Sequence, residues 1–182
     1  GNAQAVPSCD WPLLDYIDRG LTGVVDLSCW VGLLRADIES GDVTGIIANP
    51  TVTDLLIQNN PSLTQATASI CDFPALQYLQ CNNCNFASFD FDCVPTLEIL
   101  RIYSNPLTTL IHTFPTGVKE LYMSNTSNTT ANLVALSGTP AFSTPHFPLL
   151  EVLFWDYAGV SDLLIPTQWP NMRVFVFGDP SG

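Results

Sequence analysis

Residues 97–107 read LEILRIYSNPL, and the spacing of their apolar residues predicts the fold. Aliphatic side chains stand at offsets 0, 3, 5 and 10 from Leu97, and Asn105 stands at offset 8. A strand repeats every two residues and a helix about every 3.6 residues, so neither element accounts for the whole stretch. The pattern indicates a short strand followed by a bend that turns further apolar residues inward.

The same spacing recurs along the chain. Copies start at Val52, Leu76, Leu97, Val118, Leu150 and Met172, with a weaker copy at Thr22. In the copy at Leu76, Cys84 replaces the asparagine. A bulky apolar residue and a proline precede five starts, at Phe73-Pro74, Val94-Pro95, Phe114-Pro115, Phe147-Pro148 and Trp169-Pro170. Because proline fixes φ and cannot donate to a sheet, it suits the turn that leads into each strand.

These units resemble the leucine-rich repeat family, whose pattern is L-x-x-L-x-L-x-x-N/C-x-L in units of 20 to 29 residues. The resemblance covers about residues 52–179, with an extension to 22. It implies an α/β-type curved solenoid, mostly β and irregular, with one parallel sheet of about six or seven short strands. The asparagine at offset 8 is expected to satisfy main-chain groups where the chain leaves the strand. The alternative is a β sandwich, which does not require prolines in phase with its strands.

The parts of the chain that depart from the regular repeat are an N-terminal cap, two long intervals and the last coil. We expect residues 1–21 to form an N-terminal cap and residues 22–182 to form the coils. In the cap, Leu13, Leu14 and Ile17 predict a short helix, with Asp10 as N-cap and Pro12 in its first turn. The long intervals 22–52 and 118–150 are expected to hold extra material on the convex side. The last coil, near Phe177, is expected to be open.

The charge balance excludes some partners. The chain of 182 residues carries a net charge of −12, with five Lys and Arg against 17 Asp and Glu. Proteins bind nucleic acids and anionic membranes through clusters of Lys and Arg side chains, so we expect neither as a partner. No apolar run approaches the length of a membrane span, so direct membrane insertion is not expected.

Cysteines and glycosylation motifs favour an extracellular, secreted or cell-surface protein. The six cysteines are Cys9, Cys29, Cys71, Cys81, Cys84 and Cys93, and the sequons start at Asn125 and Asn128. We expect Cys9 and Cys29 to form a disulfide beside the N-terminal segment. Cys71, Cys81, Cys84 and Cys93 are candidates for disulfides or buried thiols whose connectivity the sequence does not determine, and a bond between Cys71 and Cys93 across adjacent coils is geometrically reasonable. A zinc site built from the last four cysteines is the alternative.

No constellation of catalytic residues is evident. The two histidines, His112 and His146, lie near no nucleophile motif, and Asp90 and Asp92 flank Phe91 in a turn. An acidic group at Asp37, Glu39 and Asp42 lacks the spacing of an EF-hand. We therefore expect no enzyme activity, no cofactor and no metal.

The remaining candidate site is the concave face of the sheet, formed by offsets 2, 4, 6 and 7. This face is rich in amides near residue 58 and in apolar and aromatic residues near residue 154. The binding residues predicted on it are Tyr78, Ile99, Arg101, Tyr103, Tyr122, Val152, Phe154, Tyr157, Val174 and Val176. An exposed apolar patch usually marks an interface, so we predict a binding protein whose partner is a protein, a glycan or another copy of the chain. The alternative is a filament subunit packed through the open last coil.

Overall fold

The computed structural model describes residues 20–39, 41–107, 109–111, 115–123, 148–156 and 169–178. Within these ranges the chain forms eleven strands and one 3₁₀ helix. They are β1 (Thr22–Asp26), β2 (Arg35–Asp37), β3 (Asp42–Ile47), β4 (Asp54–Leu56), η1 (Ile70–Asp72), β5 (Tyr78–Gln80), β6 (Ser88–Asp90), β7 (Ile99–Arg101), β8 (Thr109–Ile111), β9 (Glu120–Tyr122), β10 (Val152–Asp156) and β11 (Val174–Gly178).

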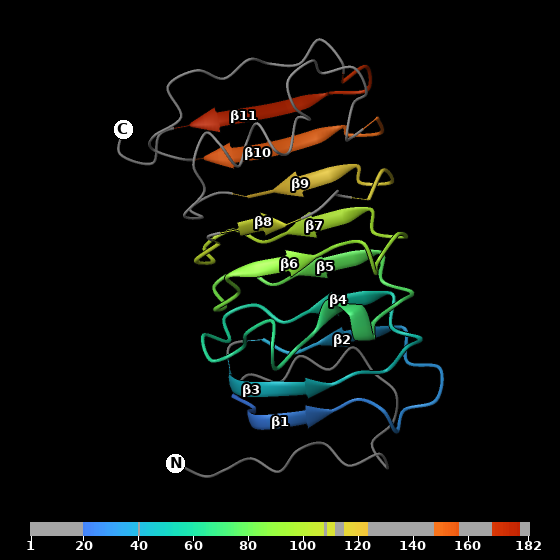
Figure 1. Ribbon diagram of the computed structural model, residues 1–182, viewed down its shortest axis with the longest axis vertical. Coiled ribbons are helices and arrows are strands. Elements are labelled where there is room, and N and C mark those ends of the chain that lie inside the picture. Colours follow the sequence, from blue (N-terminus) through green and yellow to red (C-terminus); the bar gives the residue numbers. More distant parts are fainter. Residues whose placement is uncertain are drawn as a thin grey trace.

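The fold is a solenoid of parallel strands. Seven strands form one sheet in the order β11-β10-β9-β7-β5-β4-β2, and they stack in a column (Figure 1). There are two smaller parallel sheets, β1-β3 and β6-β8, and in them β3, β6 and β8 each follow a strand of the main sheet along the chain. The predicted sheet of about six or seven strands is therefore confirmed.

The repeat spacing places the core as predicted. Leu79, Leu100 and Leu121, all at offset 3, stand opposite one another in adjacent strands. Offset 5 is equally buried at Ile57, Cys81, Ile102 and Met123. One coil has no second layer of its own, so stacking removes these side chains from water, and repetition stabilises the fold.

The asparagine at offset 8 joins successive coils. Asn60 donates through Nδ2 to the carbonyl oxygens of Ile38 (2.8 Å) and Ile57 (3.0 Å), and its Oδ1 accepts from the amide of Val43 (3.3 Å). Asn105, two coils further along the chain, makes the equivalent bonds to the carbonyl oxygens of Cys81 and Ile102 and from the amide of Phe86. These bonds satisfy buried main-chain groups that the strand ladder does not reach, as the sequence predicted.

Regular turns join the coils. The amide of Leu76 donates to the carbonyl oxygen of Phe73 (3.0 Å), and that of Leu97 donates to Val94 (3.2 Å). The intervening Pro74 and Pro95 therefore occupy the second position of a four-residue turn, where their fixed φ is favoured. After the strand, the residue at offset 7 has a positive φ in three coils, at Asn59 (58°), Asn83 (54°) and Ser104 (56°).

The predicted unit at Thr22 is wrong as a strand of the main sheet. β1 pairs with β3 instead, and the first described strand of the main sheet is β2. A copy of the repeat lies within the interval 22–52, with Leu33, Ala36, Ile38 and Val43 buried at offsets 0, 3, 5 and 10. Small residues at offsets 3 and 8, Ala36 and Gly41, concealed it, so this interval is a coil rather than extra convex material.

Some sequence predictions lie outside the described residues. These are the helical cap with Asp10, Pro12, Leu13, Leu14 and Ile17, most of the interval 118–150, and the chain beyond β11. Within the part that the structure describes, η1 is the only helical element.

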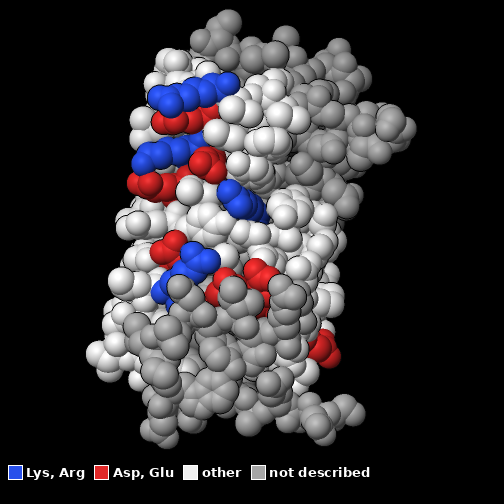
Figure 2. Space-filling view, turned by 180° about the vertical axis from the view of Figure 1, so that it is seen from behind, with Lys and Arg blue, Asp and Glu red and all other residues white. Residues whose placement is uncertain are grey.

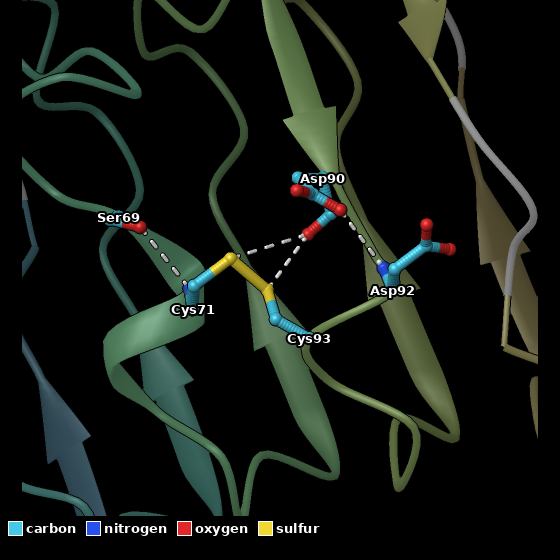
Figure 3. Close-up of a disulfide and its surroundings, with 5 residues drawn as sticks. All are labelled: Ser69, Cys71, Asp90, Asp92 and Cys93. Carbon is cyan, nitrogen blue, oxygen red and sulfur yellow. Dashed lines mark hydrogen bonds between the residues drawn. A yellow bond between two sulfur atoms is a disulfide. The ribbon is translucent and has the colours of Figure 1, made fainter.

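One of the candidate disulfides is present. Cys71 and Cys93 are bonded, with their Cα atoms 5.1 Å apart, and they join the return segments of adjacent coils (Figure 3). The two sulfur atoms lie 3.9 and 3.2 Å from the carbonyl oxygen of Asp90. Cys29 is also disulfide-bonded, while Cys9, its predicted partner, lies outside the described residues.

Cys81 and Cys84 are not disulfide partners but buried free thiols. Both face the core, and the thiol of Cys84 donates to the carbonyl oxygen of Ile57 at 3.1 Å, as the asparagines do elsewhere. Burial raises the pKa of Cys84 to about 11 and that of Cys81 well above its usual value. The zinc alternative fails because Cys71 and Cys93 are already bonded to each other.

Candidate functional site

The outer face of the seven-stranded sheet, called the sheet face below, carries most of the predicted binding residues. Offset 2 contributes Asp54, Tyr78, Ile99, Glu120, Val152 and Val174, and offset 4 contributes Leu56, Gln80, Arg101, Tyr122, Phe154 and Val176. Because the strands are parallel and in register, each set forms a continuous row across the sheet. The structure thus brings together the predicted residues that it describes.

Arg101 is held at the centre of this face. Its guanidinium carbon lies 4.7 Å from the ring centroid of Tyr122 and 5.5 Å from that of Tyr78. Tyr122 stacks in turn on Phe154, with centroids 4.7 Å apart and planes inclined by 8°. Since adjacent strands are also about 4.8 Å apart, stacking follows from placing rings in register. The facing surfaces of Tyr122 and Phe154 are therefore used within the chain, and a partner meets the ring edges.

Polar contacts fix the same side chains. The hydroxyl of Tyr78 donates to Gln80 Oε1 at 2.5 Å, and that of Tyr122 donates to Glu120 Oε2 at 3.4 Å. Desolvation is the main cause that raises the pKa of both tyrosines, so both hydroxyls remain protonated donors at neutral pH. Glu120 also lies 3.8 Å from Arg101. The charge of Arg101 is therefore already partly offset within the chain.

A row of alternating charges borders the apolar part of the sheet face. At offset 1, four consecutive coils carry Glu98, Lys119, Glu151 and Arg173. Lys119 Nζ lies 2.7 Å from Glu98 Oε2, and Arg173 Nε lies 3.6 Å from Glu151 Oε2. Figure 2 shows these signs alternating down one side of the face, next to uncharged surface. We name these four residues the charge row.

The charge row is the feature that sequence reasoning missed. Only offsets 2, 4, 6 and 7 were expected to face outward, whereas the turn before the strand also directs offset 1 to the surface. Aligning the repeat copies at offset 1 shows the alternation directly, so the signal is in the sequence. The described part of the chain has four Lys and Arg residues, Arg35, Arg101, Lys119 and Arg173. All four lie on or beside this face, and each has an acidic partner.

The two ends of the sheet face differ. At the apolar end, Val174 and Val176 are 40% and 41% exposed, and Val152 and Phe154 are partly buried. At the amide-rich end, Asp37 and Leu56 are buried although they occupy the outward offset 4. The predicted gradient from amides to apolar residues is present, but its N-terminal part is less accessible than expected.

That amide-rich end has its own internal contacts. Gln58 donates through Nε2 to Glu39, and Asn83 donates to Asn59 Oδ1 at 2.8 Å. Asn82 is buried, and its Oδ1 has no hydrogen-bond partner among the described residues. Gln58, Asn59 and Asn83 are thus bonded within the chain, which leaves the apolar end as the more available surface.

The remaining predicted residues are either partly buried on the sheet face or outside the described residues. Tyr103 and Ile99 are partly buried on the face, whereas Tyr157, His112, His146 and the sequons at Asn125 and Asn128 lie outside the described residues. Asp90 is exposed in its turn and accepts from the amide of Asp92 (3.1 Å). Across the described ranges, no three His, Cys, Asp or Glu side chains form a group that could hold a metal ion.

Comparison with protein-family models, with curated proteins and with solved structures finds no match to this chain. In the described part of the chain, no helix has the length and apolar character needed to cross a membrane. The sheet face therefore has to be interpreted from its own chemistry.

Proposed function

We propose that this protein is a non-catalytic binding module that recognises its partner through the apolar half of the sheet face. The supporting observation is the exposure of Val174 and Val176 beside Phe154 on strands that are otherwise in regular register. An exposed apolar row on a regular sheet suits a protein partner or the apolar face of a glycan.

We further propose an extracellular setting. The Cys71–Cys93 disulfide and the bonded Cys29 support it, because structural disulfides persist mainly in oxidising compartments. Glycosylation at Asn125 and Asn128 remains part of this proposal. Intact mass before and after glycosidase treatment of protein from a secretory host tests it, and an unchanged mass would exclude modification at both sequons.

Membership of the leucine-rich repeat family also remains a proposal. Its support is the recurrence of the spacing in the described coils and the hydrogen bonds of Asn60 and Asn105. A protein of this type would use a sheet and its rigid scaffold for recognition, which agrees with the proposed function.

The second candidate function is that of a subunit in a homopolymer. The exposed apolar residues on β11, the outermost described strand of the main sheet, favour it. A subunit that associates through two different surfaces would form an open chain, whereas one self-complementary surface gives a closed dimer.

A binding screen tests the main proposal. Labelled wild-type protein and Phe154→Asp are applied in parallel to arrays of glycans and of extracellular proteins. We expect at least one partner whose binding falls more than tenfold in the variant. A partner bound equally by both proteins would place recognition elsewhere.

A further inference from the structure

The signs of the charge row are complementary to the same row read in reverse order. From β7 to β11 the row is negative, positive, negative, positive, at Glu98, Lys119, Glu151 and Arg173. A two-fold axis parallel to the strands, between β9 and β10, would reverse the order of coils and preserve the order of offsets. It would set Glu98 opposite Arg173 of a second copy, and Lys119 opposite Glu151.

The same rotation matches the neighbouring rows. At offset 2 it sets Ile99 opposite Val174 of the second copy, and at offset 4 it sets Tyr122 opposite Phe154. Glu120 would meet Val152, which is the one mismatch, but its carboxylate is already held by Arg101 and Tyr122 of its own chain. Arg101 would lay its stem against Val176, a contact that arginine commonly makes.

We infer that the apolar half of the sheet face binds a second copy of this chain, forming a closed two-fold dimer whose register is set by the charge row. The inference rests on the proposed function, since it names one partner of the same face. A two-fold contact is isologous, so it consumes the face and does not propagate into a filament. The charges fix the alignment and the apolar side chains supply the burial.

The size of the surface indicates a weak dimer. Four strands at about 4.8 Å cover roughly 19 Å, and six residues at about 3.3 Å cover roughly 20 Å. The two copies together would bury on the order of 1,000 Å², which is at the low end for specific interfaces. We therefore expect dissociation in the micromolar to millimolar range, with weaker association at high salt.

Two charge reversals separate contacts between copies from contacts within one chain. In Lys119→Glu, the new carboxylate would face Glu151 of an identical copy, and in Glu151→Lys the new amine would face Lys119. Each variant alone should therefore associate at least tenfold more weakly than the wild type. In a mixed dimer of the two variants, the new carboxylate at position 119 of one copy would face the new amine at position 151 of the other. The second pair, Glu151 of the first copy and Lys119 of the other, would be native.

Sedimentation equilibrium of the wild type, both variants and their mixture tests the inference, with circular dichroism as the check on folding. We expect dimers for the wild type and for the mixture only. A defect within one chain cannot be repaired by mixing, so recovery in the mixture identifies the contact between copies. A wild type that stays monomeric to millimolar concentration at low salt, or variants that dimerise normally, would overturn the inference. If Phe154→Asp still loses binding to another partner in that case, the proposed function stands.

Discussion

The side-chain amide of Asn105 donates a hydrogen bond to the main-chain carbonyl oxygen of Cys81, one coil earlier, at 2.8 Å. It also donates to Ile102 O at 3.0 Å and accepts from the amide of Phe86 at 3.1 Å. One buried side chain thus satisfies main-chain groups in two successive coils. This is the physical reason for the asparagine in a pattern that is otherwise aliphatic.

Asn105→Ala should destabilise the fold by about 2–4 kcal/mol, since several buried main-chain groups lose their partners. Urea denaturation measures the change. Asn85→Ala in the preceding coil is the matched control, because Asn85 is exposed, and we expect it to change stability by less than about 0.5 kcal/mol. Equal effects of the two substitutions would show that the buried amide has no special role.

Gly41→Ala tests the coil that begins at Leu33. A Cβ at Gly41 would lie well inside van der Waals contact of the carbonyl oxygen of Leu21, so we expect a loss of about 1–3 kcal/mol. Gly117→Ala is the control, because its Cβ would lie 3.5 Å from the nearest atom, Leu97 O. Thermal unfolding of the two variants should therefore differ clearly. A harmless Gly41→Ala would argue against the close approach of these two segments.

The disulfide should contribute to stability through the unfolded state. Cys71 and Cys93 are separated by 22 residues, for which loop closure gives about 3 kcal/mol. Replacing both by serine is preferable to reduction, because Cys29 is also disulfide-bonded. A double variant as stable as the wild type in denaturant titration would show that this cross-link is dispensable.

The buried thiols should make the fold sensitive to alkali. Burial raises the pKa of Cys84 to about 11 in the folded state, so the thiolate forms more readily when the chain unfolds, near pH 9. Above about pH 9 the unfolded state binds fewer protons than the folded state, so the free energy of unfolding falls as pH rises. The stabilisation due to Cys84 is fully present below about pH 9, and about 2–3 kcal/mol of it is lost as pH rises to about 11.

Replacing Cys81 and Cys84 by alanine should flatten that part of the pH profile of unfolding. Tyr78 and Tyr122, whose pKa values are also raised, contribute to the pH dependence of unfolding in both proteins. In the native wild type at neutral pH, both thiols should resist a thiol reagent until the chain unfolds. Rapid labelling of the folded protein would contradict their burial.

Much of the scaffold could be predicted because its physics is local and periodic. Burial at offsets 0, 3, 5 and 10 around Leu100 and the bonding of Asn105 both follow from a single repeating geometry. The coil at Leu33 escaped because Ala36 replaces a bulky residue at offset 3, and Gly41 replaces the asparagine at offset 8, where a Cβ would clash with the carbonyl oxygen of Leu21. Gly32, in the turn directly before Leu33, has a positive φ of 75°, a conformation that glycine adopts readily.

The site was only partly predictable. The rows of offsets 2 and 4 follow from strand alternation, whereas the exposure of offset 1 depends on the turn geometry before each strand. Burial of Asp37 and Leu56 on the outward side could not be derived from the repeat either, since it depends on packing beyond a single coil. The bond between Cys71 and Cys93 was a reasonable candidate because adjacent coils place their return segments side by side, but the sequence left the pairing of the four cysteines open.

The most direct test of the account compares two matched pairs of substitutions. Val174→Asp with Val176→Asp alters the sheet face, while Val24→Asp with Ile47→Asp alters similarly exposed residues on the sheet of β1 and β3. Both pairs change the charge equally. Binding of each protein to immobilised copies of the chain, glycans and extracellular proteins is then measured. We expect the first pair to abolish binding and the second to leave it within about twofold of wild type. Equal binding by both, or loss only in the second, would contradict it.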